Sequence, residues 1–220
     1  MLRAAGVGAG DEVIVPAFGN VEVAEAAAKA GATVAFADID PMTYCLDADA
    51  VEAVVTPRTA AIVVVHRFGR SADMVRLREL GQRHGLLVLE QGESEAPYDE
   101  IAQRRARAAY LDARLRGVRT PDGGDGHTYQ QYVVRVPGNG RPDRDAFARA
   151  VRARGVEGRV PVKTPVHRMA GFRRDVCLPE TERAADETLV LPVDASLTKR
   201  EMQRIVSACN ALGGLVQPAV

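Results

Sequence analysis

The chain has 220 residues, of which 46% are hydrophobic and 26% charged, values typical of a globular protein with one core or two small ones. Basic and acidic residues number 29 each, so no net charge would draw the chain to nucleic acid or to an anionic membrane. No apolar run approaches the length of a membrane-spanning helix and no signal peptide opens the sequence, so we expect a cytoplasmic protein.

Cysteine and histidine give no sign of a metal site or of a disulfide framework. The three cysteines, Cys45, Cys177 and Cys209, are far apart and lack the paired spacing of zinc ligands. An odd number of widely separated thiols is typical of reduced cysteines in the cytoplasm. His127 and His167 also lack metal-ligand spacing, so the sequence predicts no metal ion.

Apolar runs alternate with helical patterns over the N-terminal part of the chain. The expected strands are residues 12–15, 33–37, 60–65 and 86–89. The expected helices are residues 20–30, 47–55 and 71–84, with Asn20 and Ser71 as N-caps. Strands this apolar are buried on both faces, so the fold class is α/β, a parallel sheet with helices on both faces.

Right-handed crossovers place the carboxyl ends of these strands along one edge, where a site is expected. The segments at this edge are Phe18 to Asn20, Asp38 to Asp40, His66 to Gly69 and Gln91 to Glu95. Asp38 and Asp40 are predicted to accept hydrogen bonds from turn and helix-start amides. His66 either contacts a ligand or makes a structural hydrogen bond. Glu93 and Glu95 form either an acid/base pair or part of a solvated loop.

The C-terminal part of the chain alternates differently and predicts a small α+β domain. An amphipathic helix over residues 98–116 leads into it. The expected strands are 132–136, 156–162 and 189–193, and the expected helices are 143–154, 182–187 and one opened by a capping box at Thr198 to Glu201. The glycine-rich residues 121–126 indicate a flexible loop, because the Lys-Ser/Thr ending of a phosphate-binding loop is absent.

Eight stretches, in order along the chain, resemble one known family. They are Gly6 to Pro16, Asp38 to Pro41, Thr56 to Thr59, Val65 to Met74, Arg83 to Glu90, Tyr129 to Val136, Pro165 to Arg168 and Leu191 to Asp194. Together they resemble the DegT/StrS sugar aminotransferases, which have the fold type I architecture of enzymes dependent on pyridoxal phosphate (PLP). The resemblance implies a partial PLP-transferase large domain in residues 1–96, a linking helix in 97–117 and a small C-terminal α+β domain in 118–220.

The resemblance also implies which positions would remain of a cofactor site, namely Asn20, His66, Gln91 and Ser94. In the family, the residue at the position of Gln91 is an aspartate that bonds the pyridine nitrogen of PLP, and the residue at Ser94 is a glutamine. Asn20 stands where many members have an aromatic residue that stacks on the PLP ring. The family's Ser-x-x-Lys segment, which carries the Schiff-base lysine, should follow Glu95, but the sequence continues directly into a helix that resembles a much later one.

These departures remove what transamination by PLP needs most. Only three of the 29 basic residues are lysines, and of Lys29, Lys163 and Lys199 only Lys163 could lean toward a cleft from the small domain. A neutral amide at Gln91 bonds the ring nitrogen without favouring its protonated form, which a carboxylate would do by charge. We therefore predict no catalytic residue and no bound cofactor, PLP being implied only by the resemblance.

Three functions follow from this pattern. The first is a degenerate aminotransferase homologue, a pseudoenzyme acting as a binding or partner subunit in a homodimer or in a heterodimer with an active paralogue. The second is an enzyme that acts on a nucleotide-sugar or related small molecule in cell-envelope or secondary-metabolite biosynthesis, either with a lysine supplied by a partner or without PLP. The third is a functionless gene remnant whose exposed apolar sheet edges cause aggregation or forced oligomerisation.

Overall fold

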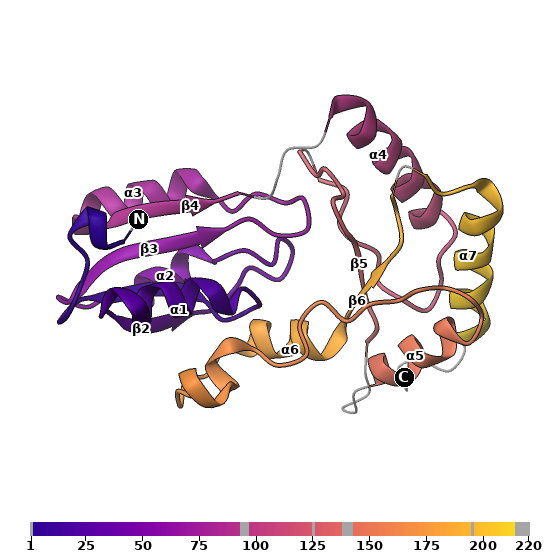
Figure 1. Cartoon of the computed structure of the whole chain (residues 1–220). Helices are drawn as coiled ribbons and strands as arrows, with labels where there is room; N and C mark the ends of the chain where they lie inside the picture. Colours follow the sequence, from indigo (N-terminus) through magenta and orange to yellow (C-terminus); the bar gives the residue numbers. More distant parts are fainter. Residues whose placement is uncertain (1, 93–96, 125, 138–142, 195, 214–220) are drawn as a thin grey trace. The chain divides into compact units, whose positions relative to one another are not determined.

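The computed structural model describes residues 2–92, 97–124, 126–137, 143–194 and 196–213, which form two compact units (Figure 1). The first unit comprises Met1–Arg67, Ser71–Glu93 and Thr164–Arg183, and the second comprises Phe68–Arg70, Ser94–Lys163 and Ala184–Val220. The chain therefore passes more than once between the units. Residues 164–183, which the sequence assigns to the C-terminal domain, are part of the first unit.

A parallel sheet of four strands forms the centre of the first unit. The strands are β1 (Glu12–Pro16), β2 (Thr33–Ala37), β3 (Thr59–Val65) and β4 (Leu87–Gln91), and their order across the sheet is β2-β1-β3-β4. Each neighbouring pair is parallel, as the unbroken apolar runs predicted. The predicted parallel sheet is thus confirmed, with strand ends within two residues of those expected.

Helices cover both faces of this sheet because successive strand residues point to opposite faces. Val13 and Val15 of β1 pack in one core with α1 (Val21–Ala30). Ile14, between them, packs in the other core with α2 (Ala48–Ala53) and α3 (Met74–His84). Figure 1 shows these helices alongside the strands of the same unit. The two-sided burial that the sequence predicted is therefore present.

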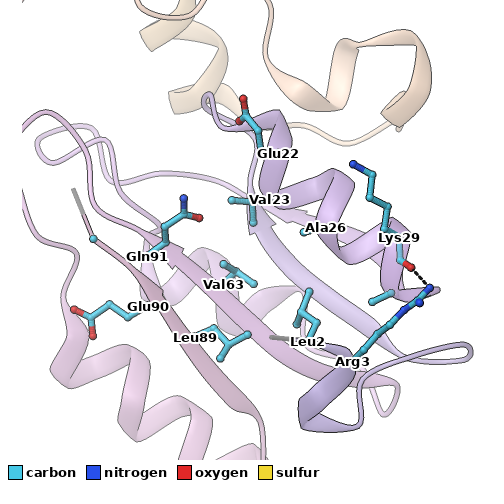
Figure 2. Close-up of a pocket in the computed structure, with 12 residues that line it drawn as sticks. Leu2, Arg3, Glu22, Val23, Ala26, Lys29, Val63, Leu89, Glu90 and Gln91 are labelled. Carbon is cyan, nitrogen blue, oxygen red and sulfur yellow. Dashed lines mark hydrogen bonds between the residues drawn. The ribbon is translucent and has the colours of Figure 1, made fainter. Parts of the chain in front are cut away.

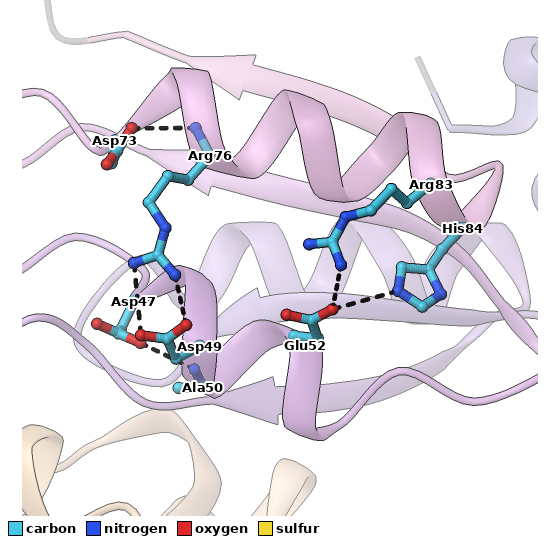
Figure 3. A network of polar contacts seen from close by, with 8 residues as sticks. All are labelled: Asp47, Asp49, Ala50, Glu52, Asp73, Arg76, Arg83 and His84. Atoms are coloured by element: carbon cyan, nitrogen blue, oxygen red, sulfur yellow. Dashed lines mark hydrogen bonds and ion pairs between the residues drawn. The ribbon is translucent and has the colours of Figure 1, made fainter.

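Ion pairs join the outer surfaces of α2 and α3 (Figure 3). The guanidinium of Arg76 pairs with the carboxylate of Asp49, and that of Arg83 lies 2.6 Å from the carboxylate of Glu52. All four side chains are more than one-third exposed, so each pair adds little to stability. The helices are held mainly by the apolar core beneath them.

The start of α3 differs from the sequence expectation. Asp73, rather than Ser71, is its N-cap, and its carboxylate accepts a hydrogen bond from the backbone N–H of Arg76. The backbone N–H of Ala72 donates instead to the ring of His66, which holds this residue outside the helix. The prediction for Ser71 was wrong because a contact with the end of β3 decides where the helix begins.

The second unit is built around an antiparallel pair of strands, β5 (Tyr132–Arg135) and β6 (Thr188–Leu191). Its helices are α4 (Tyr98–Asp112), α5 (Asp143–Arg152) and α7 (Lys199–Gly213), while α6 (Pro179–Glu187) begins in the first unit and ends in the second. Leu111, Tyr132, Phe147 and Cys209 are among its fully or nearly fully buried side chains. A compact apolar core therefore unites the strands with helices from three parts of the sequence.

Two local expectations for the second unit have opposite outcomes. The capping box is confirmed, because Glu201 accepts from the N–H of Thr198 and its own N–H donates to the Thr198 hydroxyl. The strand expected over residues 156–162 is wrong, since only an isolated bridge from Arg159 to Val190 forms there. Pro161 lacks a backbone N–H and cannot continue a ladder.

The remaining described elements are three short 3₁₀ helices, Arg3–Ala5, Val166–Arg168 and Ala170–Phe172. No helix in the described part of the chain is both long enough and apolar enough to cross a membrane.

Candidate functional site

The turn after β1 is fixed by a contact between Asn20 and Arg67. The side-chain oxygen of Asn20 accepts a hydrogen bond of 2.7 Å from the Arg67 guanidinium. Asn20 has a left-handed backbone, with φ 50° and ψ 57°, and its side chain makes no cap bond to α1. The predicted N-cap role of Asn20 was wrong, because N-cap residues have extended backbones and this side chain is turned toward Arg67.

Arg67 covers the same turn at two further points. A Cβ atom added at Gly19 would lie 2.8 Å from the guanidinium of Arg67, and Gly19 has a φ of +80°, a left-handed conformation that favours glycine. The guanidinium carbon also lies 5.7 Å from the centre of the Phe18 ring, within range of a cation–π interaction. Sequence reasoning missed Arg67, although the small residue Gly19 next to a polar Asn20 was a signal of a close approach.

His66 links three elements at the carboxyl edge of the sheet. Its Nδ1 accepts a hydrogen bond of 3.1 Å from the N–H of Ala72, so Nε2 carries the proton and donates it to Glu90 at 2.8 Å. Glu90 also pairs with Arg78 of α3, at 2.7 Å. These bonds, the one from His66 foremost, hold the pKa of Glu90 below its usual value. His66 therefore makes the structural hydrogen bond that the sequence allowed for it.

Gln91 and Ser94 complete the positions expected from the resemblance. Gln91 is the last residue of β4, and its side chain is exposed while its carbonyl accepts from the N–H of His66. Ser94, together with Glu93 and Glu95, lies outside the described residues. Of the four expected positions, the structure brings His66 and Gln91 together on adjacent strand ends and ties Asn20 to Arg67.

Asp38 and Asp40 bind backbone amides, as predicted, but two of the partners of Asp38 are far away in the sequence. Asp38 accepts from the N–H of Ile39 and also from those of Glu180 and Thr181, at the start of α6. The carboxylate of Asp40 accepts from two N–H groups of the turn that follows it. Both carboxylates are thus used to hold the backbone.

The buried histidines of the two units also have structural partners. His127 accepts from the N–H of Tyr129 and stacks on its ring at 3.9 Å, and burial lowers the pKa of His127 to about 4. His167 lies 3.3 Å from the carboxylate of Glu182. Among the described residues, no group of three or more His, Cys, Asp or Glu side chains could hold a metal ion.

A hollow of about 950 Å³ lies between α1 and the edge strand β4 of the first unit (Figure 2). Its apolar lining comes from Leu2, Val23, Ala26, Ala30, Val63 and Leu89. Polar groups lie around it, from Arg3, Glu22, Lys29, Glu90 and Gln91. Lys29 is 77% exposed, pairs with Glu25 and lies in the last turn of α1, whereas Gln91 lies at the end of β4. The hollow is therefore an apolar surface with charges only on its rim.

The sequence model of the DegT/DnrJ/EryC1/StrS aminotransferase family matches residues 1–92 and 98–210. This chain belongs to that family. The predicted resemblance is thereby confirmed, and the match is interrupted only at residues 93–97, directly after β4.

Relatives of this DegT/DnrJ/EryC1/StrS family member include several aminotransferases of sugars and cyclitols. The L-glutamine:2-deoxy-scyllo-inosose aminotransferase of Streptomyces kanamyceticus is 54% identical over 89 residues, 40% of this chain and 21% of that protein. The GDP-perosamine synthase of Caulobacter vibrioides is 32% identical over 200 residues, 86% of this chain and 50% of that protein. The chain thus spans about a fifth of the first relative and half of the second.

Several solved structures share the fold of this chain. An aminotransferase from Brucella abortus matches with a TM-score of 0.87 at 19% identity, and the match covers 97% of this chain and 82% of the Brucella chain. The aminotransferase TlmJ from Streptoalloteichus hindustanus matches with a TM-score of 0.86 at 25% identity, over 98% of this chain and 83% of TlmJ. The structure of NtdA from Bacillus subtilis, with bound cofactor PMP, matches with a TM-score of 0.85 at 19% identity, over 97% of this chain and 70% of NtdA. The predicted α/β fold class is confirmed.

One relative shows that this family member lacks an internal stretch. The pleiotropic regulatory protein of Geobacillus stearothermophilus is 29% identical over 299 residues, 93% of this chain and 79% of that protein. Since 93% of 220 residues is about 205, about 94 of the 299 aligned positions have no counterpart here. Within residues 1–210, the family match is interrupted at residues 93–97, directly after β4.

The described residues at the carboxyl edge do not fit the family's cofactor. Holding PLP covalently requires an amine, and in the described part of the first unit the one lysine, Lys29, lies in the last turn of α1. Lys163 and Lys199 belong to the second unit, where both are exposed. The strand-end group Gln91 is an amide, which cannot hold the ring nitrogen protonated by charge.

Proposed function

We propose that this chain is a degenerate sugar-aminotransferase homologue that does not transfer amino groups by itself and acts as a binding or partner subunit. The observation that carries the proposal is the chemistry of the carboxyl edge. Among the described residues of this edge, the side chain of Asn20 is bonded to Arg67 and that of His66 to Glu90, and the strand-end residue is Gln91. The one carboxylate among these groups, that of Glu90, is already paired with His66 and Arg78, and none of them supplies a lysine amine.

The ligand and partner classes come from the relatives. Their names describe aminotransferases of scyllo-inosose derivatives and of nucleotide-linked sugars, so the small molecule of this chain would be a keto-sugar, its nucleotide derivative or a keto-cyclitol. The protein partner would be a second copy of the chain or an active paralogue. If the assembly were active, the partner would supply the Schiff-base lysine. An independent enzyme would have to supply that lysine from its own chain.

The first test adds PLP and L-glutamine to the purified chain. We expect no absorption band of protein-bound PLP after desalting and no amino transfer to a keto-sugar. Borohydride reduction followed by peptide mapping gives a second readout, because it fixes any lysine that has captured the aldehyde. Labelled Lys163 together with turnover by the chain alone would show an independent enzyme and end the proposal.

A second test asks for the partner directly. The chain is mixed with an active family member from the same source, and the oligomeric state is measured by light scattering. A mixed complex whose activity or substrate affinity differs from that of the active protein alone supports the partner role. Two proteins that stay separate, with unchanged kinetics, argue against it.

A further inference from the structure

We infer that the free edge of β4 and the adjoining hollow beside α1 receive an apolar strand from a second polypeptide, one that carries a counterpart of the missing internal stretch. The inference rests on the proposed partner role and names the surface through which that role is exercised. Four observations carry it, concerning the two sheet edges, the β4 backbone, the lining of the hollow and the position of the missing stretch.

The two edge strands of the sheet differ in how well they are covered. On β2, Val34, Phe36 and Ala37 are at most 5% exposed, as in a finished edge. On β4, residues 87–89 are only partly buried and the last two residues are exposed, although the strand is as apolar over its first three positions. Both strands are edges of the sheet, but the side chains of β2 are better buried than those of β4.

The backbone of β4 has donors and acceptors that face away from the sheet. The carbonyl of Gln91 accepts from the N–H of His66, so the peptide groups of Gln91 face β3. Because alternate residues of a strand direct their peptide groups to opposite sides, those of Val88 and Glu90 face the open edge. In the described part of the chain, no strand pairs with this edge. Such an edge is a template for strand addition.

The hollow favours a polypeptide over a small molecule. Leu89 and Val63 come from the sheet and Val23 and Ala26 from α1, and together they form a continuous apolar lining (Figure 2). Small-molecule sites add a few converging polar groups that fix orientation. Here the charged groups stand on the rim, and Lys29 and Glu90 have partners within the fold. The apolar side chains of an added segment would fill this surface.

The family comparison indicates what kind of chain would fill it. The family match stops at residue 92 and resumes at 98, directly after β4, and about 94 positions of one relative have no counterpart here. We infer that the additional chain of the relative belongs at this break, where the sheet is open. A second copy of the present chain would pair its own β4 and leave both hollows unfilled, because it too lacks the stretch.

The test uses the corresponding stretch of the Geobacillus stearothermophilus pleiotropic regulatory protein, expressed as a separate chain together with this protein. We expect a one-to-one complex by size exclusion with light scattering. Amide hydrogen exchange at Val88 and Glu90 should slow in the complex, since these N–H groups would gain partners. Exchange on β2 provides the internal control, because that edge should not change.

A matched pair of variants on α1 tests the hollow. Ala26 and Ala28 are both exposed on the same helix, but only Ala26 lines the hollow. Ala26→Glu would place a carboxylate against the incoming apolar segment and should weaken the complex about tenfold or more. Ala28→Glu should leave the affinity unchanged. Circular dichroism confirms that both variants are folded, and Leu89→Glu, on the opposite wall, repeats the test from the sheet.

Several outcomes would overturn the inference. They are the absence of a complex, a complex with unchanged exchange at β4, equal weakening by Ala26→Glu and Ala28→Glu, and a homodimer of the chain alone through β4. Binding is measured here without any cofactor or amino donor. Amino transfer by the chain alone would refute the proposed function. It would not change the binding results, which test the docking surface independently.

Discussion

The carboxylate of Asp38, at the end of β2, accepts a hydrogen bond of 2.8 Å from the backbone N–H of Thr181 in the first turn of α6. A second bond, 2.9 Å long, comes from the N–H of Glu180, and the donors lie 142 and 143 residues further along the chain. Asp38 thus caps a helix from the C-terminal half of the sequence. Together with the burial of Val166 and Leu178 in the core of the first unit, this contact holds residues 164–183 to that unit.

Asp38→Ala should remove this cap and destabilise the protein by about 2 kcal/mol, since two helix-start N–H groups lose their acceptor. The measurement is the urea midpoint of unfolding, followed by circular dichroism. Asp40→Ala serves as the control, because its carboxylate caps only a local turn and should cost less. Equal losses of stability in the two variants would mean that the Asp38 cap on α6 contributes no more than the local turn at Asp40.

Asn20 offers a test that separates a clamp from an N-cap. Its side chain bonds Arg67 and its backbone is left-handed, a conformation that Asn tolerates better than most residues. Asn20→Asp keeps the acceptor and should be nearly neutral, while Asn20→Ser should cost about 1–2 kcal/mol in unfolding free energy. Serine is a good N-cap, so a neutral Asn20→Ser variant would favour the cap and contradict the clamp.

The strands could be read from the sequence because burial on both faces leaves continuous apolar runs. Gly31 also marks the end of α1, because a left-handed glycine cap ends the helix there. The start of α3 could not be read in the same way. Ser71 and Asp73 are both good caps, and the choice between them depends on the bond from Ala72 to His66, which is a tertiary contact.

Site geometry was less accessible than the fold for the same reason. The pairing of Asn20 with Arg67 and of Asp38 with the start of α6 joins residues that are 47 and 142 positions apart. Local pattern carries no information about such pairs. The strand expected over residues 156–162 does not form, because Pro161 lacks the backbone N–H that a ladder hydrogen bond needs.

The bond from His66 to Glu90 predicts a specific dependence of stability on pH. The pKa of Glu90 is lowered in the folded state, so its contribution is present above the unfolded pKa and is lost as pH falls through the folded pKa. Glu90→Gln should therefore be less stable than wild type near neutral pH, and the difference should shrink below pH 4.5, the ordinary value for this group. Urea unfolding across this pH range measures it. A difference that stays constant with pH would exclude the ionised carboxylate as its source.

The outer ion pairs and the core beneath them should differ greatly in weight. Leu77 of α3 is fully buried against the sheet, whereas Arg76 on the same helix pairs with an exposed Asp49 (Figure 3). Leu77→Ala should cost about 2–5 kcal/mol in unfolding free energy, and Arg76→Ala less than about 1 kcal/mol. The small effect of Arg76→Ala should shrink further in high salt. If Arg76→Ala lowered the unfolding free energy as much as Leu77→Ala, the surface ion pair would stabilise α3 as strongly as its buried core contacts do.

Gln91→Asp tests whether the missing carboxylate alone explains the absence of a working cofactor site. The aspartate would restore the charged group that the family has at this strand end, but it would add no amine to hold the PLP aldehyde. We expect no covalent PLP adduct after borohydride reduction of this variant, as with the control Gln91→Asn. Mass mapping of the reduced protein measures the outcome lysine by lysine. An adduct at Lys163 in Gln91→Asp but not in Gln91→Asn would show that the second unit supplies the amine. It would also show that the lack of a carboxylate at position 91 is what prevents the adduct in the wild-type chain.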